Sequence, residues 1–108
     1  MLTKKDYCDY ETSVALYELG YDCQVIHLIA EKITLYEAQK WMREKNIEVN
    51  ASFDKMEDGW IAFIQRLDYP DLYGTDVFST VYNTYESALL VSIKEAVKIL
   101  KEELNEET

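Results

Sequence analysis

Three side chains in this sequence carry the nitrogen and sulfur atoms that bind transition metals or act as nucleophiles. They are Cys8, Cys23 and His27. A structural zinc site uses four such ligands, so this set is one short. His27 lies inside the apolar run VIHLIA, where we expect a packed strand residue, and free cysteines are commonly buried and inert. We therefore expect no metal site and no cofactor.

A second set of possible ligands follows the predicted central strand. Asp68, Asp71 and Asp76 lie in the segment DYPDLYGTD and offer carboxylate oxygens, which calcium prefers. Their order differs from the D-x-D-x-D-G pattern and terminal glutamate of an EF-hand loop. We favour a solvated loop over an ion site here.

Signatures of the common enzyme classes are absent. The sequence contains no GxSxG, GxxxxGK[ST], GxGxxG or HExxH motif, and it has only three glycines. One histidine without an evident nucleophile gives little basis for acid–base catalysis. A carboxylate pair assembled by the fold would still make an enzyme, and this alternative stays open. We expect a non-enzymatic protein with no catalytic residue.

A group of aromatic and aliphatic side chains is the best candidate for an interaction surface. It comprises Tyr69, Leu72 and Tyr73 in the long loop, and Phe78 and Tyr82 in the last predicted strand. Left exposed, these residues would form an apolar patch of the kind that marks a binding site. Either the first helix and Gln24–Ile29 fold over this face, or a second copy buries it. The expected partner is another protein or a second copy of the chain.

The charge of the chain restricts the partners further. Aspartate and glutamate total 21 against 11 lysines and arginines, a net charge of -10. Such a balance disfavours nucleic acid and anionic membranes, which are bound through lysine and arginine. The negative charge is compatible with a basic protein partner. It is also compatible with our alternative function, in which this chain mimics nucleic acid and blocks a DNA- or RNA-binding protein. The surplus is spread over several segments, so we favour solvated surface charge.

Length and composition predict one domain. A chain of 108 residues buries roughly two-thirds of its unfolded surface, enough for a core without disulfides. We expect residues 1–7 and 105–108 to be frayed. The first residues lack the apolar centre of a signal peptide, and no apolar run approaches the ~18 residues that span a bilayer. The expected location is the cytoplasm, with reduced thiols.

One segment, Thr34–Phe53, predicts a helix, its end and the first strand of a sheet. Thr34 and Glu37 form a T-x-x-E capping box. Apolar residues then follow at helical spacing, at Leu35, Ala38, Trp41 and Met42. We expect the helix to end at Asn46. From there alternation predicts a strand whose inward residues are Ile47, Val49, Ala51 and Phe53.

The rest of the sheet and the last helix follow in order. Lys55–Gly59 predicts a hairpin loop. Trp60–Leu67 is apolar on both faces at its start, which is typical of a central strand covered on both sides. Asp76–Asn83 predicts an outer strand. Thr84 caps the last helix, and we expect an acidic frayed tail at Glu102–Thr108. The apolar stripe of this helix is Tyr85, Ala88, Leu89, Ile93, Ala96, Val97, Leu100 and Leu104.

Asp9 and Gly20 mark the ends of a first helix. Its apolar residues at helical spacing are Tyr10, Val14, Tyr17 and Tyr21. The run that follows favours a strand over Gln24–Ile29 because it is short and contains β-branched residues.

These elements predict an α+β fold with the order α-(β)-α-β-β-β-α. We expect an antiparallel sheet of three or four strands, with the second and last helices on one face and the first helix on the other face or at an edge. Double-stranded-RNA-binding domains share the order α-β-β-β-α, but they bind RNA largely through basic residues. Here the last helix begins Thr84-Tyr85-Glu86-Ser87 and has no lysine before Lys94, so RNA binding is disfavoured.

Several segments resemble a group of small α+β proteins from Bacteroides-type gut bacteria and their phages and mobile elements. The likeness covers most of the chain, and TLYEAQKWMRE is its most specific part; the other segments are Asp9-Tyr10-Glu11, Gly20-Tyr21-Asp22, Asp58-Gly59-Trp60 and TYESA. The resemblance implies a bacterial or phage cytoplasmic domain. It implies no activity, cofactor or catalytic residue.

Overall fold

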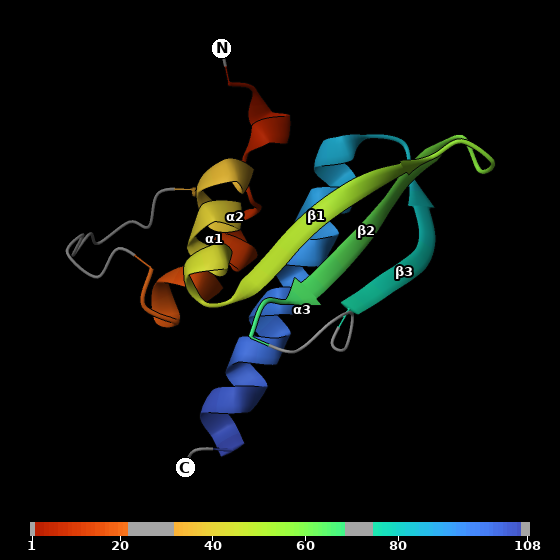
Figure 1. The fold of residues 1–108 in the computed structure, drawn as a ribbon. Coiled ribbons are helices and arrows are strands. Elements are labelled where there is room, and N and C mark those ends of the chain that lie inside the picture. The colour runs from red at the N-terminus through yellow and green to blue at the C-terminus, as the bar shows by residue number, and fades with distance from the viewer. Residues whose placement is uncertain (1, 22–31, 69–74, 107–108) are drawn as a thin grey trace.

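The computed structural model describes residues 2–21, 32–68 and 75–106 (Figure 1). Its helices and strands are α1 (Tyr10–Glu18), α2 (Leu35–Glu44), β1 (Ile47–Asp54), β2 (Gly59–Arg66), β3 (Thr75–Tyr82) and α3 (Tyr85–Glu106). The strands form an antiparallel sheet in the order β1-β2-β3. The predicted α+β class and the order α-β-β-β-α are confirmed. The strand predicted at Gln24–Ile29 lies outside the described residues.

Helix α2 begins and ends as its sequence predicts. The Thr34 hydroxyl accepts a hydrogen bond from the Glu37 backbone N–H at 3.1 Å, and Glu37 accepts one from the Thr34 hydroxyl at 2.7 Å. After the helix, Asn46 takes a left-handed conformation with φ 65°, which asparagine tolerates better than most residues. The residues that α2 buries are Leu35, Ala38 and Met42.

Helix α3 extends further than predicted. The Thr84 hydroxyl accepts a hydrogen bond from the Ser87 N–H at 3.1 Å and caps the helix. From Tyr85 the helix continues for 22 residues to Glu106, so it includes 102–106 of the tail that the sequence predicts to fray. An ion pair between Glu103 and Arg66 of β2 ties this last part to the sheet.

Helix α1 ends in a Schellman motif, as Gly20 predicts. The N–H of Gly20 donates to the carbonyl of Tyr17 at 3.1 Å, and the N–H of Tyr21 donates to that of Leu16 at 2.9 Å. Gly20 has a φ of 109°, a conformation that a side chain would strain. At the other end, the Asp9 carboxylate accepts a hydrogen bond from the Thr12 N–H at 2.8 Å.

The apolar face predicted for α1 is wrong in part, because Tyr17 and Tyr21 pack against the core but Tyr10 does not. Tyr10 is 56% exposed, and the face that α1 buries consists of Thr12, Ser13, Ala15 and Leu16. Small side chains let a helix pack closely, and their hydroxyl groups can be buried when they are hydrogen-bonded. The Ser13 hydroxyl oxygen meets this condition, because it accepts a hydrogen bond from the Ile33 N–H at 3.1 Å.

The first residues are also more ordered than predicted. Lys4–Asp6 form a 3₁₀-helix, in which Asp6 accepts a hydrogen bond from the Thr3 N–H at 2.8 Å. The Tyr36 hydroxyl donates to the same carboxylate group at 2.6 Å. The backbone N–H of Cys8 donates to the carbonyl of Ile33 at 2.8 Å. These contacts join the segment to the start of α2.

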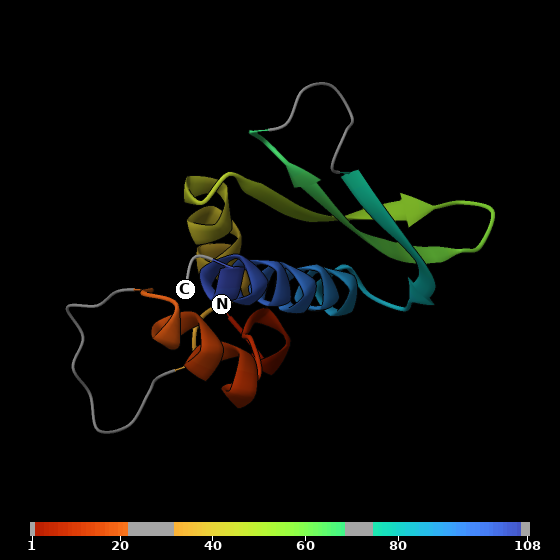
Figure 2. The same ribbon diagram turned by 90° about the horizontal axis from the view of Figure 1, so that it is seen from below.

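All described helices lie on one side of the sheet (Figure 2). Helices α2 and α3 pack on its inner face, as predicted, and the main core lies between them and the sheet. Helix α1 packs against α3 on the side away from the sheet, so the expectation that α1 covers the other face or an edge is wrong. The largest fully buried side chains are Leu16, Leu35, Met42, Ile47, Val49, Ile64, Leu89 and Ile93.

We predict that Gly59→Ala destabilises the protein by about 1–3 kcal/mol, because the methyl group overpacks the sheet. A Cβ at this position would lie 2.9 Å from the Tyr82 carbonyl oxygen, and closer still to Val81 Cγ1. Urea unfolding of both single variants and of the double variant with Val81→Ala measures the coupling. Removal of Cγ1 should recover part of the loss, whereas fully additive effects would contradict this geometry.

Candidate interaction surfaces

The outer face of the sheet carries an apolar stripe that no described helix covers. Direct cross-strand partners share a face, and the register pairs Ile61 with both Ser52 and Val81. It also pairs Phe63 with Asn50. We name Ile61, Phe63 and Val81 the outer stripe; all three are half-buried. On β1 the same face is polar, so the stripe follows β2 and the adjoining part of β3.

Of the five residues predicted to form the interaction surface, the structure describes the surroundings of Tyr82 alone. Tyr69, Leu72 and Tyr73 lie outside the described residues, and of Phe78 only its place in β3 is described. Tyr82 pairs with Trp60 and packs against a cluster of three buried alanines under α3. Its ring therefore contributes to the inner face of the sheet. Side chains alternate between the two faces along β2, so Ile61 and Phe63 lie on the face opposite to Ala62 and Ile64. This alternation is the sequence signal from which the outer stripe could have been predicted.

The two edges of the sheet differ. At the β1 edge, the Gln39 side chain of α2 donates a hydrogen bond from Nε2 to the Val49 carbonyl at 2.9 Å. This contact occupies a backbone acceptor that would otherwise be open to another strand. Among the described residues, no strand pairs with the far edge of β3.

The β1–β2 hairpin ends in a second exposed apolar group. Met56 at its tip is 95% exposed, and Phe53 is 48% exposed. The Asp54 side chain shapes the turn by accepting hydrogen bonds from the N–H groups of Met56 and Glu57, at 2.9 and 3.3 Å. Phe53 contacts Trp60 edge to face, with ring centroids 5.3 Å apart. Both side chains are more exposed than the half-buried residues of the outer stripe, but they lie at the end of the hairpin and not on the sheet face.

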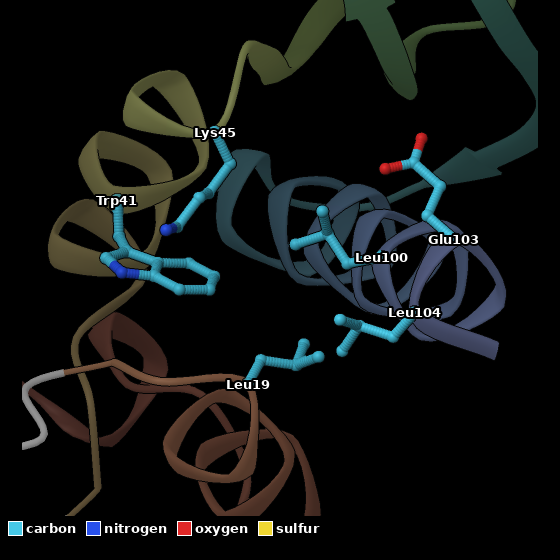
Figure 3. Close-up of a pocket in the computed structure, with 6 residues that line it drawn as sticks. All are labelled: Leu19, Trp41, Lys45, Leu100, Glu103 and Leu104. Atoms are coloured by element: carbon cyan, nitrogen blue, oxygen red, sulfur yellow. The ribbon is translucent and has the colours of Figure 1, made fainter. Parts of the chain in front are cut away.

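A cleft of about 150 Å³ lies where the ends of the three helices converge (Figure 3). Its residues come from the C-terminal parts of α1, α2 and α3, and Leu19 and Lys45 are the C-cap residues of the first two helices. Apolar side chains form most of its wall, with one ammonium and one carboxylate group at the rim. We call it the helix-end cleft; it is lined by Leu19, Trp41, Lys45, Leu100, Glu103 and Leu104.

Trp41 is the centre of this cleft. The Lys45 ammonium nitrogen lies 5.3 Å from the centroid of its ring, a cation–π distance. Tyr21 contacts the ring edge to face at 6.1 Å. Sequence periodicity predicts Trp41, Leu100 and Leu104 as core residues, yet Trp41 is only half-buried and Leu104 is 50% exposed. The apolar stripes of α2 and α3 therefore remain partly open at this end of the helices.

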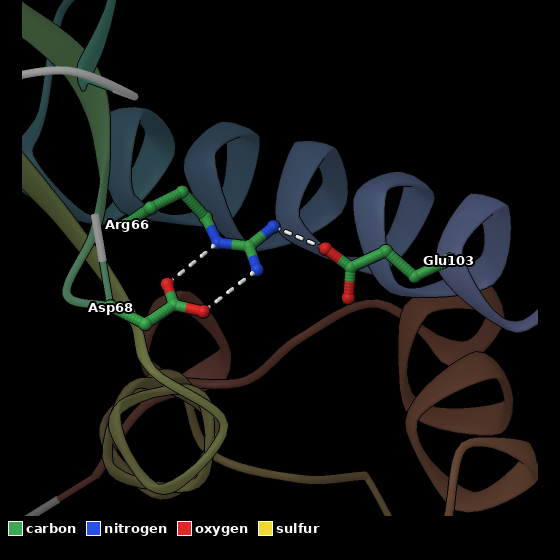
Figure 4. A network of polar contacts seen from close by, with 3 residues as sticks. All are labelled: Arg66, Asp68 and Glu103. Atoms are coloured by element: carbon green, nitrogen blue, oxygen red, sulfur yellow. Dashed lines mark hydrogen bonds and ion pairs between the residues drawn. The ribbon is translucent and has the colours of Figure 1, made fainter.

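A polar network lies beside the cleft (Figure 4). The Arg66 guanidinium donates to both carboxylate oxygens of Asp68, at 3.3 and 3.4 Å, and also to Glu103. Burial alone would lower the pKa of Arg66, but these two carboxylates outweigh burial and raise it. The sequence contains a signal for this network, because alternation places Arg66 inward, where a charge needs partners. Arg66 is only 14% exposed.

Several carboxylate groups form hydrogen bonds or ion pairs with other residues of the chain. They hold helix caps, turns, tyrosine hydroxyls or cationic side chains, and they are Asp6, Asp9, Glu37, Asp54, Asp68, Glu95 and Glu103. Lys94 and Lys98 of α3 pair with Asp9 and Glu95 at 2.7 and 3.1 Å. These contacts give seven of the 21 acidic residues a local structural role, and they leave these two lysines less suited to bind phosphates.

None of the described carboxyl groups with a shifted pKa is suited to act as a general acid. A carboxyl group that donates a proton near neutral pH needs a raised pKa, yet the pKa values of Asp6, Glu37 and Asp68 are lowered. The main causes are hydrogen bonds from Tyr36, Thr34 and Arg66 respectively. Cys8 is buried, and burial raises the pKa of its thiol to about 12, so it is a poor nucleophile.

Within the part of the chain that the structure describes, no three histidine, cysteine, aspartate or glutamate residues are placed to hold a metal ion. Cys23 and His27 lie outside that part, as does Asp71 of the possible calcium loop. Asp68 is engaged by Arg66.

Comparison with known proteins gives no relative. No family model matches the chain, and searches of curated proteins and of solved structures found no similar protein. Among the described residues, no helix has the length and apolar character needed to cross a membrane.

We predict that Asp9→Asn lowers stability at neutral pH by about 0.2–1 kcal/mol, the range for exposed ion pairs. Burial opposes ionisation of Asp9, but hydrogen bonds from Lys94 and Thr12 outweigh it and lower its pKa to about 2. This stability is present above the unfolded pKa near 3.9 and is lost as pH falls through about 2. Asparagine keeps a capping oxygen, so the substitution removes mainly the charge.

Urea unfolding from pH 7 to pH 2 measures the difference between the two proteins. The difference should be constant at neutral pH and disappear near pH 2. The control is Asp58→Asn in the exposed hairpin turn. A deficit that persists unchanged at pH 2 would show that the Asp9 charge is not its cause.

Proposed function

We propose that this chain is a non-enzymatic accessory protein that acts through protein–protein binding, and that a second copy packs on the outer face of its sheet. The observation that carries this proposal is the outer stripe. Ile61 and Phe63 of the central strand lie on a face that no described helix covers (Figure 2). Burial of apolar side chains is the dominant favourable term in protein association.

The distribution of charge supports a second copy as the occupant. Two chains that each carry a net charge of -10 repel one another wherever their charged surfaces meet. The outer stripe consists of uncharged residues, so contact through it brings the fewest like charges together. A twofold axis through the stripe would place each Phe63 against the stripe of the other copy. Such an interface uses the same patch on both copies.

The chemistry of the described residues supports binding over catalysis. The lowered carboxyl pKa values and the inert Cys8 thiol provide neither a proton donor near neutral pH nor an activated nucleophile. The loop residues Tyr69, Leu72 and Tyr73 remain part of the proposed surface as a prediction from the sequence.

The proposal includes a biological setting. The resemblance to small proteins of Bacteroides-type gut bacteria and their mobile elements favours a bacterial or phage cytoplasm. A buried, free Cys8 is compatible with such a reducing compartment.

We predict that Phe63→Lys shifts the protein to a monomer, because the substitution places a charge in the centre of the interface. Sedimentation equilibrium over a range of concentrations measures the change, and circular dichroism checks that the fold is retained. Met56→Lys is the matched control, since it adds the same charge at the hairpin tip and should leave association unchanged. A wild-type protein that stays monomeric at every concentration would contradict self-association.

A further inference from the structure

We infer that the helix-end cleft is a second binding site, which takes an apolar side chain from a basic amphipathic segment of a partner protein. This site is independent of the proposed self-association. It is built from α1, α2 and α3, and all three lie on the side of the sheet away from the outer stripe (Figures 2 and 3). A dimer formed through the sheet would leave both copies of the cleft accessible.

The cleft has the size and composition of a pocket for a single side chain. An apolar cavity of about 150 Å³ holds a benzene ring, so the cleft has room for a leucine or phenylalanine side chain. Its wall combines an aromatic ring with aliphatic side chains, at Trp41, Leu19, Leu100 and Leu104. Tryptophan is enriched among residues that dominate binding energy, particularly where neighbouring contacts exclude water. Half of the Leu104 side chain is exposed beside this ring and is available for contact.

The electrostatic surroundings of the cleft select a basic partner. The last carbonyl groups of a helix carry a partial negative charge, and three helices end around this cleft. The Glu103 carboxylate at the rim is already paired with Arg66, so the negative potential comes from the helix ends and from the net charge of -10 on the whole chain. Lys45 is the cation at the rim, and its ammonium group lies over Trp41. Cationic side chains next to the apolar anchor of the partner would therefore approach a surface of opposite sign.

The Arg66 network prepares the cleft for binding. Arg66 and Glu103 connect the end of β2 to the last turns of α3 (Figure 4). This contact holds Leu100 and Leu104, one turn apart on α3, in position opposite Trp41 and Leu19. A preformed pocket binds with a smaller loss of conformational entropy than one that must be ordered by its ligand.

Trp41 itself can report on binding once Trp60 is replaced, because these are the two tryptophans of the chain. The probe is an acetylated and amidated peptide of leucine pairs alternating with lysine pairs, added to the Trp60→Phe protein. We expect a saturable change in Trp41 fluorescence. Two matched peptides, with alanine for leucine and with glutamate for lysine, should each bind at least about tenfold more weakly.

Leu104→Glu separates insertion into the cleft from general attraction between an acidic protein and a basic peptide. The substitution adds a negative charge, so general attraction would strengthen binding, whereas insertion predicts a loss of at least about tenfold. Met56→Glu adds the same charge at a remote exposed position and should leave the affinity equal or slightly higher. Equal binding by the Leu104→Glu and Met56→Glu proteins would overturn the inference, as would equal binding of the alanine peptide.

Phe63→Lys distinguishes this site from the proposed self-association. If the cleft binds as inferred, the Phe63→Lys protein retains peptide binding whether or not it is monomeric. Peptide binding that disappears with Phe63→Lys, while the fold is retained, would place the peptide on the sheet and would overturn the assignment to the cleft.

Discussion

The close approach of α3 to the sheet is the constraint on which the rest of the structure depends. Ala51, Ala62 and Ala88 meet between β1, β2 and α3, and their methyl groups let the helix lie directly on the strands. Trp60 and Tyr85 enclose this contact edge to face, with ring centroids 5.3 Å apart. Larger side chains fill the space further along α3, where α2 also joins the core; they include Ile47, Val49, Ile64, Leu89 and Ile93.

Both proposed surfaces follow from this packing. Because α3 and α2 occupy the inner face, α1 packs on the helical side of the molecule, and the outer stripe at Ile61 and Phe63 has no described helix over it. On the helical side, residues from the C-terminal parts of the three helices surround the cleft. Trp41 and Leu104 are left half-open there as the helix-end cleft. Helices packed on one side of one sheet thus leave two apolar surfaces that face in different directions.

Local signals in the sequence predict most of the fold but little of the surfaces. The caps at Thr34 and Thr84 depend on neighbouring residues, so they can be recognised in the sequence alone. The position of α1 depends on long-range packing through Ser13, whose hydroxyl carries no signal of its burial. Arg66 is intermediate, because its inward position can be predicted from alternation but its partner Glu103 cannot. The cleft follows from the angles between helices, which periodicity does not contain.

The central claim is that the outer face of the sheet is where this chain meets another protein. The most direct measurement is the methyl NMR spectrum of the wild-type protein over a dilution series. The account predicts that the methyl signals of Ile61 and Val81 shift with concentration, while those of Val49 and Ile64 on the inner face stay constant. Spectra that do not change on dilution, or shifts confined to residues of the helices, would contradict it.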